Sequence, residues 1–199
     1  LRQIIKELLI HHRLRIPTWD LHIGFGSDIV TTLHYYVIGD PLNLSAAFVP
    51  VRYTEYLYDF LCFFRYYLAG ITFSWYCFYN KNKKIPVLLG SLIYVYSQWM
   101  IVTGLDHPYF INPCIYLPLI MLGADKIFDK KKPWTYIGAL ALAGVSNFYF
   151  FYMLGIFTVI YAVFRYFTKF KGFLLKEFTP VFGRFFFYTV LSLMISGVI

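Results

Sequence analysis

Acidic and histidine side chains gather in one short stretch of an otherwise apolar chain. Asp20 and His22 alternate with apolar residues, and Asp28 follows shortly after them. In an extended segment, alternating side chains point to the same side. A carboxylate can act as a general base, and carboxylates with an imidazole can hold a divalent cation, such as magnesium or manganese, that bridges phosphate oxygens. We therefore expect Asp20 and Asp28 to be catalytic and His22 to bind substrate.

More polar residues follow in the same stretch. His34, Tyr35 and Tyr36 adjoin one another, and Asp40 stands directly before Pro41. We expect Tyr35, Tyr36 and Asp40 to contribute to substrate binding. A purely local role is the alternative for Asp40, because Asp-Pro is a common opening of a turn.

Two glycines in this stretch, Gly24 and Gly26, raise the question of a nucleotide-binding loop. The G-x-G pattern has no preceding strand and no third glycine, so it is not a dinucleotide fingerprint. Turns with positive φ are the simpler explanation of both glycines.

A second acid and imidazole, Asp106 and His107, lie in a short turn before Pro108. We expect Asp106 to be catalytic and His107 to bind substrate, because this turn and the first acid-rich stretch would converge from different hairpins. In the alternative, either residue caps the helix that begins near Pro108.

Two further ionisable residues, Asp59 and Arg65, lie inside an apolar run. An arginine near the bilayer centre costs roughly 2.5–3.5 kcal/mol on insertion scales, so it normally faces a partner or a water-filled cavity. At about 100° per residue the two side chains fall on different faces of a helix, which argues against a direct ion pair. We expect Arg65 to bind substrate, for example a lipid-linked phosphate. Alternatively, it neutralises Asp106 or another acid.

The elements that must position these residues are membrane spans. Of the 199 residues, 59% are hydrophobic and only 14% are charged, which is too little charge to cover a soluble domain. The apolar residues also fall in long runs. The net charge of +8 does not indicate nucleic-acid binding, because most basic residues lie in short segments between apolar runs, where positive charge sets membrane topology.

Cysteine and aromatic content add little to the functional interpretation. Cys62, Cys77 and Cys114 lie within apolar segments and form no C-x-x-C pair, so neither a disulfide framework nor a zinc site is expected. The aromatic share of 23% could reflect an A/T-rich coding bias and carries no functional weight by itself.

The chain divides into an extracytoplasmic region, residues 1–55, and a transmembrane bundle, residues 56–199. Residues 1–15 have apolar side chains at helical spacing, typical of an amphipathic helix at the membrane interface, although an ordinary packed helix has the same pattern. The glycines and prolines of residues 17–55 predict a structured loop with short helices. In the bundle we expect about five spans and a truncated sixth, namely 56–79, 85–104, 110–124, 134–147, 148–167 and 183 onward.

The connections between these spans predict their orientation. Connections 80–84, 125–133 and 168–184 are rich in lysine, whereas 105–112 and 146–150 have no basic residue. The positive-inside rule places the lysine-rich connections in the cytoplasm, and residues 1–55 and 105–112 outside. The chain has no initiator methionine and ends within an apolar run, so we expect a fragment of a longer, all-α membrane protein.

Several short motifs follow one another along nearly the whole chain. They are Trp19-Asp20, Gly24-Phe25-Gly26, Asp28, Tyr35-Tyr36, Asp40-Pro41-Leu42, Val49-Pro50, Leu68-Ala69-Gly70, His107-Pro108, Leu117-Pro118-Leu119 and Asn147-Phe148-Tyr149-Phe150. Together they resemble the YfhO family of bacterial multipass membrane proteins.

This resemblance implies a helical bundle of the GT-C glycosyltransferase type. It implies inverting transfer of a sugar from a polyprenyl-phosphate donor to an envelope acceptor outside the cell, such as lipoteichoic or wall teichoic acid. GT-C enzymes carry an acid in the first outer loop and often a second acid in the next outer loop, the place that Asp106 has here. The leading acid of the family directly follows its first transmembrane helix, and that stretch would precede Leu1.

Two other functions remain open at the level of sequence. A transporter or lipid flippase would have Asp59 and Arg65 along a path through the bundle, and a scaffold for envelope assembly would need no catalytic residue. We favour the enzyme because the polar groups cluster in the outer loops and not at mid-membrane. The sequence leaves open the donor sugar, the acceptor, the metal requirement and the oligomeric state.

Overall fold

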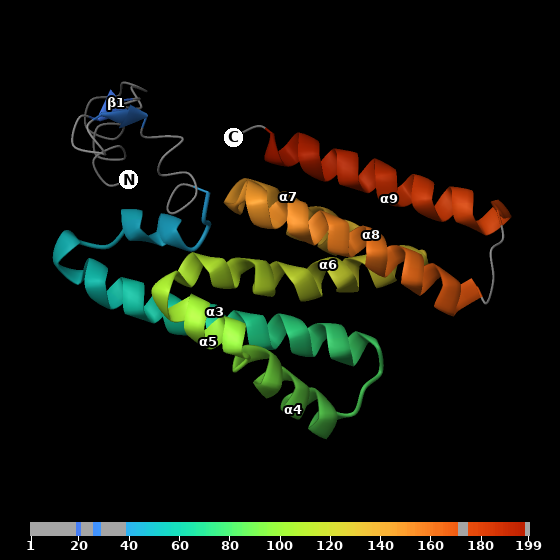
Figure 1. Cartoon of the computed structure of the whole chain (residues 1–199), viewed down its shortest axis with the longest axis horizontal. Helices are drawn as coiled ribbons and strands as arrows, with labels where there is room; N and C mark the ends of the chain where they lie inside the picture. The colour runs from blue at the N-terminus through green and yellow to red at the C-terminus, as the bar shows by residue number, and fades with distance from the viewer. Residues whose placement is uncertain (1–18, 21–25, 29–38, 171–174, 198–199) are drawn as a thin grey trace. The chain divides into compact units, whose positions relative to one another are not determined.

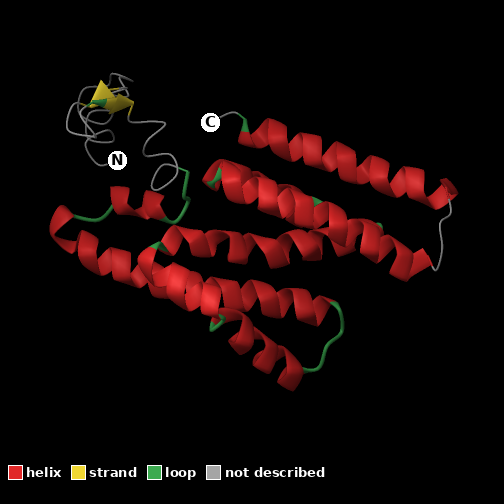
Figure 2. Cartoon of the chain, viewed as in Figure 1, coloured by secondary structure: helices red, strands yellow, loops and turns green. Residues whose placement is uncertain are grey.

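Helices make up most of the chain in the computed structural model, which describes residues 19–20, 26–28, 39–170 and 175–197 (Figure 2). The chain forms two compact units, Leu1–Phe64 and Arg65–Ile199, which meet inside helix α3 (Thr54–Tyr79). The amphipathic helix predicted for residues 1–15 lies outside the described residues, as do His22, His34, Tyr35 and Tyr36.

The first unit contains a small β-hairpin that the sequence did not predict. Strand β1 (Trp19–Asp20) pairs antiparallel with strand β2 (Ser27–Asp28). Gly26, just before β2, has a φ of +110°, a conformation that favours glycine. This φ agrees with the turn explanation of the G-x-G pattern. A Cβ at Gly26 would also lie 3.2 Å from the Trp19 ring.

The short helices expected in the same region are 3-10 turns. They are η2 (Asn43–Ala47) and η3 (Val51–Tyr53), the second of which leads directly into α3.

The second unit is a helical bundle built around α6 and α7 (Figure 1). Its elements after α3 are α4 (Lys84–Val95), α5 (Gln98–Asp106), the 3-10 turn η4 (Pro108–Ile111), α6 (Asn112–Phe128), α7 (Trp134–Ser146), α8 (Phe148–Phe170) and α9 (Leu175–Ser196). Helices α8 and α9 both pack against this central pair. The core is apolar and fully buried, as Ile120, Leu122, Tyr136 and Leu140 illustrate.

Four stretches of the described residues are long and apolar enough to cross a membrane. They are Lys84–Gly104, Pro108–Phe128, Phe148–Phe170 and Phe178–Ser196, while α7 is apolar but shorter. Large apolar side chains such as Leu88, Ile160 and Phe186 are exposed on the outer helices, as expected for surfaces that face lipid. The predicted class, an all-α membrane protein, is therefore confirmed. Helix α3 has 26 residues and is not among these four stretches, so its crossing of the membrane stays a prediction.

Two predicted spans have different boundaries in the structure. The 85–104 run is divided between α4 and α5, because the backbone of Ser97 is extended, with φ −64° and ψ 153°. The last span is predicted to start at residue 183, whereas α9 begins at Leu175. The charged residues Lys176 and Glu177 interrupt the apolar run, but they do not end the helix.

The two prolines of α6 explain how a Pro-containing helix crosses the core. Pro113 lies in the first turn, where its missing N–H has no helical partner to lose. Pro118 lies inside the helix and cannot donate to the carbonyl of Cys114, four residues earlier. The Tyr94 hydroxyl of α4 donates to that carbonyl at 2.7 Å and replaces the missing bond.

Tyrosine hydroxyl groups also join other helices. Tyr66 donates to the carbonyl of Met100 at 2.8 Å, Tyr116 is 2.9 Å from the Ser146 hydroxyl, and Tyr136 is 3.0 Å from the Thr189 hydroxyl. Such bonds stabilise helix association inside a membrane. Burial of apolar side chains does not favour association there, because lipid is as apolar as the protein interior. Part of the tyrosine content thus has a structural role that composition alone did not reveal. Cys62, Cys77 and Cys114 are partly exposed.

Candidate functional site

The connections of the second unit lie at two opposite ends of the bundle (Figure 1). Asp106 and Asn147 belong to one end, and the lysine-rich turns after α3 and α6 belong to the other. The stretch Pro108–Phe128 separates these ends by about 30 Å at 1.5 Å per residue. This alternation agrees with the predicted topology, while the assignment of one end to the cytoplasm stays a prediction.

Asp106 occupies an electrostatically unfavourable position. It is the last residue of α5 and is exposed, and a carboxylate there meets the negative end of the helix dipole. Among the described residues its side chain has no hydrogen bond or ion pair. The capping alternative does not account for it, because the residue that precedes η4 is His107, which makes no side-chain capping bond.

His107 anchors a group of aromatic rings beside Asp106. Its Nδ1 lies 3.1 Å from the Tyr109 hydroxyl, and its ring centroid lies 5.2 Å from that of Phe110. Phe110 contacts Phe150 of α8 at 5.0 Å between centroids, and Phe150 contacts Tyr149 at 5.3 Å. The structure thus brings the aromatic run that begins α8 next to the Asp106 turn. Such rings suit a membrane interface and can also stack against a sugar.

Arg65 lies in α3 and contacts the first residue of α6. Its side chain is buried, with 2% exposed, and its Nε donates to Oδ1 of Asn112 at 3.1 Å. One partner of this guanidinium is therefore an amide that lies at the Asp106 end of α6. Asp59 is exposed and Arg65 is buried, in agreement with the prediction that they occupy different faces of the helix.

In the first unit, the hairpin brings Asp20 and Asp28 onto paired strands. Trp19 lies opposite Asp28, and Asp20 lies opposite Ser27. The convergence of this hairpin with Asp106 stays a prediction.

Asp40 has the local geometry of a turn. Its Oδ1 accepts the N–H of Leu42 at 2.9 Å, and its carbonyl accepts the N–H of Asn43 at 3.1 Å. This is the turn-opening role that Asp-Pro predicts, and it favours the local alternative for Asp40 over substrate binding.

A buried ionic cluster at the lysine-rich end was not predicted from the sequence. Asp125 is 1% exposed and accepts bonds from three side chains. Arg165 Nε lies 2.8 Å and the Tyr161 hydroxyl 2.9 Å from its Oδ1, and Asn80 Nδ2 lies 3.1 Å from its Oδ2. Arg165 also donates to Asn80 at 3.1 Å, so the cluster joins the ends of α3, α6 and α8.

A second ion pair lies one helical turn beyond the first. Asp129 accepts bonds of 2.7 Å from Lys169 and from the Tyr79 hydroxyl. Partial burial would raise the pKa of Asp129, but the hydrogen bonds from Lys169 and Tyr79 lower it below its ordinary value. Together with the Asp125–Arg165 pair, these contacts join α6 to α8 up to the ends of both helices. We call these two ion pairs, Asp125–Arg165 and Asp129–Lys169, the clamp.

The sequence does contain a signal for this clamp. Asp125 and Asp129 are four residues apart on one helix, and Arg165 and Lys169 are four residues apart on another. Residues four apart share a helix face, so two such pairs of opposite charge can align. The expectation that polar groups gather only in the outer loops was incomplete, because it overlooked this pattern.

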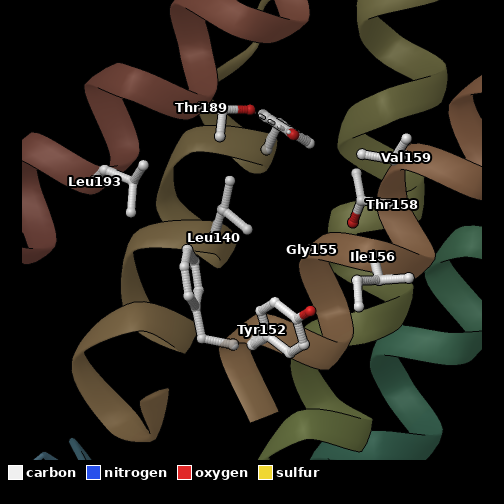
Figure 3. A pocket seen from close by; sticks show the side chains of 10 residues that line it. Leu140, Tyr152, Gly155, Ile156, Thr158, Val159, Thr189 and Leu193 are labelled. Atoms are coloured by element: carbon white, nitrogen blue, oxygen red, sulfur yellow. Dashed lines mark hydrogen bonds between the residues drawn. The ribbon is translucent and has the colours of Figure 1, made fainter. Parts of the chain in front are cut away.

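An apolar groove of about 360 Å³ lies between α7, α8 and α9 (Figure 3). The residues that line it are Tyr136, Leu140, Phe151, Tyr152, Gly155, Ile156, Thr158, Val159, Thr189 and Leu193. The Tyr136 and Thr189 hydroxyls bond to each other, and Thr158 donates to the carbonyl of Leu154. The lining therefore presents hydrocarbon and suits an apolar chain.

No group of three histidine, cysteine, aspartate or glutamate side chains among the described residues is arranged to hold a metal ion. Asp106 and His107 offer two candidate ligands at most. No catalytic step through a divalent cation is therefore derived from this part of the chain.

The fold and the exposed acid at one end of the bundle define an all-α, multipass membrane protein with a polar surface at its helix ends. Residues 5–199 match the family described as "Bacterial membrane protein YfhO", so the chain belongs to that family and the resemblance is confirmed. It is also similar to "Uncharacterized protein YfhO" of Bacillus subtilis (strain 168), with 29% identity over 110 residues. That match covers 55% of this chain and 13% of the relative's length. No solved structure matches the chain.

Proposed function

We propose that the chain is part of a glycosyltransferase that moves a sugar from a polyprenyl-phosphate donor to an envelope acceptor outside the cell, such as lipoteichoic or wall teichoic acid. Family membership and the resemblance to GT-C enzymes support the class of reaction. The observation that carries the proposal is Asp106, an exposed carboxylate held at the unfavourable end of a helix beside aromatic rings. A charge kept where it destabilises the fold is typical of a functional residue.

In this reaction Asp106 acts as the general base. Its carboxylate takes the proton of the acceptor hydroxyl, and the hydroxyl oxygen attacks the anomeric carbon of the donor sugar. The bond from that carbon to the phosphate oxygen breaks, and the phosphate leaves with the bonding electrons, so that the anomeric configuration inverts. His107 and Arg65 belong to the same end of the bundle and are the candidates to neutralise the leaving phosphate.

The apolar groove fits the other half of the donor. Its residues Phe151 and Tyr152 directly follow Phe150, which contacts the aromatic group at the Asp106 turn. A polyprenyl tail in the groove would leave its phosphate and sugar near that turn. A membrane-bound donor requires an active site at the interface, and this arrangement meets the requirement.

The test is sugar transfer by Asp106→Asn, with Asp106→Glu and Asp59→Asn as comparisons. Loss of a general base lowers the rate by about 10²- to 10⁴-fold, whereas Asp106→Glu should keep part of the activity. Removal of a charge from the C-terminus of α5 should leave the unfolding temperature unchanged or slightly higher. A lower rate in Asp106→Asn would therefore not reflect unfolding. If Asp106→Asn transfers sugar at the wild-type rate, Asp106 is not the base.

A lipid flippase is the second candidate, because the Asp125 cluster places charged groups among the helices. Such a protein would depend on Asp125 and Asp59 and not on Asp106. Lipid translocation that is lost in Asp59→Asn or Asp125→Asn and normal in Asp106→Asn would favour the flippase over the transferase.

A further inference from the structure

Two lysine-rich turns far apart in the sequence form one surface. We define the lysine surface as Lys81, Lys83, Lys84, Lys130, Lys131 and Lys132, all of which are exposed. The Tyr79 hydroxyl, at the end of α3, bonds to Asp129 at 2.7 Å. The ammonium of Lys131 lies 4.6 Å from the centre of the Tyr79 ring. These contacts hold the α3–α4 turn beside the α6–α7 turn.

The acids near this surface are neutralised by other residues. Asp125 pairs with Arg165, and Asp129 pairs with Lys169. These ion pairs of the described residues do not involve Lys81, Lys83, Lys84, Lys130 or Lys132. The lysine surface therefore keeps a concentrated positive charge.

Two residues of the lysine surface have a backbone conformation that is unfavourable for lysine. Lys81 has a φ of 62° and Lys130 a φ of 57°, and they are the two non-glycine residues with positive φ in the described part of the chain. Each follows the end of a helix, where glycine or asparagine has the lowest free-energy cost. Lysine at both positions indicates that the side-chain charge itself has a use.

Tryptophan side chains locate this surface relative to the bilayer. Trp75 and Trp134 are 50% and 69% exposed, and Lys126 lies 5.1 Å from the centre of the Trp75 ring. Exposed tryptophan at helix ends marks the level of the lipid headgroups. The two turns also adjoin the candidate spans Lys84–Gly104 and Pro108–Phe128. The lysines thus lie at the depth of the phosphate groups.

We propose that the lysine surface is a binding site for the headgroups of anionic phospholipids. Each lysine near such a membrane surface strengthens binding about fivefold. The surface holds the end of the bundle opposite to Asp106 at a fixed depth, independently of any reaction at Asp106.

The test measures energy transfer from protein tryptophans to a fluorescent phosphatidylglycerol, with the full-length protein in phosphatidylcholine nanodiscs. Wild-type protein should bind this lipid more tightly than fluorescent phosphatidylcholine, and high salt should remove the difference. Lys81→Asn with Lys130→Asn should weaken binding by about 25-fold, fivefold for each lysine. Asparagine tolerates positive φ, so this double variant should keep the wild-type unfolding temperature. The control, Arg52→Gln, removes one positive charge from an exposed residue outside the surface and should bind within twofold of wild type. Its matched comparison, Lys81→Asn alone, should weaken binding about fivefold.

Two outcomes would overturn the proposal. The first is equal binding of the two lipids by the wild-type protein, or unchanged binding by Lys81→Asn with Lys130→Asn. The second is displacement of the lipid by soluble polyglutamate at equal charge concentration, which would identify the surface as a site for an acidic polypeptide. Sugar transfer plays no part in this experiment, so its result is independent of the proposed activity.

Discussion

Close contact between α6 and α7 depends on Gly123. A Cβ built at this position would lie 2.5 Å from both the N and the Cα of Tyr136, and 2.6 Å from its Cβ. Unbonded carbon atoms normally stay about 3.5–4.0 Å apart. Tyr136 is 2% exposed, and its backbone cannot rotate away as a side-chain tip can. Gly123→Ala must therefore push α7 outward by about 1 Å.

The cost of Gly123→Ala follows from two opposing effects. Overpacking of a tight core typically costs about 1–3 kcal/mol, while alanine favours a helix over glycine by up to about 1 kcal/mol. Gly138, on α7, is the matched control, because a Cβ there would have no atom within 4 Å. Gly138→Ala should gain the helix preference without the clash. Because both variants gain the same helix preference, we expect Gly123→Ala to be less stable than Gly138→Ala by the overpacking cost, about 1–3 kcal/mol.

The assay is reversible unfolding of each variant in the same detergent or lipid, with free energies taken from denaturant titrations. Both variants replace glycine by alanine inside a helix, so differences in the unfolded state largely cancel. Equal stability of the two variants, or a more stable Gly123→Ala, would refute the claim that the backbones of α6 and α7 meet closely at this position.

Two more predictions concern single hydrogen bonds and pH. Tyr94→Phe leaves the Cys114 carbonyl without its donor and should lower the free energy of unfolding by about 1–2 kcal/mol. In a Pro118→Ala background the new N–H of residue 118 satisfies that carbonyl, so a double-mutant cycle should show a clearly smaller cost of Tyr94→Phe. An equal cost in both backgrounds would contradict this role of Tyr94. The pKa of Asp129 is lower in the folded protein than in the unfolded chain, so its contribution to stability is complete at neutral pH and is lost as the pH falls below about 4. Unfolding temperatures measured against pH should therefore fall less on the acid side in Asp129→Asn than in wild type, and parallel acid limbs would show that the pairing with Lys169 contributes nothing.

The candidate site was predicted only in part. Asp106 and His107 stood out because an acid and an imidazole interrupt apolar runs, and such residue types are visible without a structure. The contact of Phe110 with Phe150 was not predictable, because it joins residues of different hairpins. Sequence alone left two explanations of Asp106, a catalytic role and a helix cap. The structure argues against the cap, because Asp106 is the last residue of α5 and does not cap η4.

The pairing of α6 with α8 through Asp125–Arg165 and Asp129–Lys169 could not be predicted from the sequence. Equal spacing in Asp125–Asp129 and Arg165–Lys169 was present in the sequence, but spacing identifies a helix face and not the helix that it meets. Pairing across helices depends on which faces α6 and α8 turn toward each other, and side-chain packing over the whole bundle decides that.

By itself, the sequence determined the class of protein, the approximate spans and the alternation of lysine-rich and lysine-poor connections. These properties follow from hydropathy and charge, which act residue by residue on transfer between water and lipid. Only the tertiary structure decided that a tyrosine of α4 satisfies the carbonyl freed by Pro118, that two distant lysine turns form one surface, and that Gly123 permits close packing of α7. Each of these depends on distances between helices, which arise when the packed bundle must satisfy its polar groups without water.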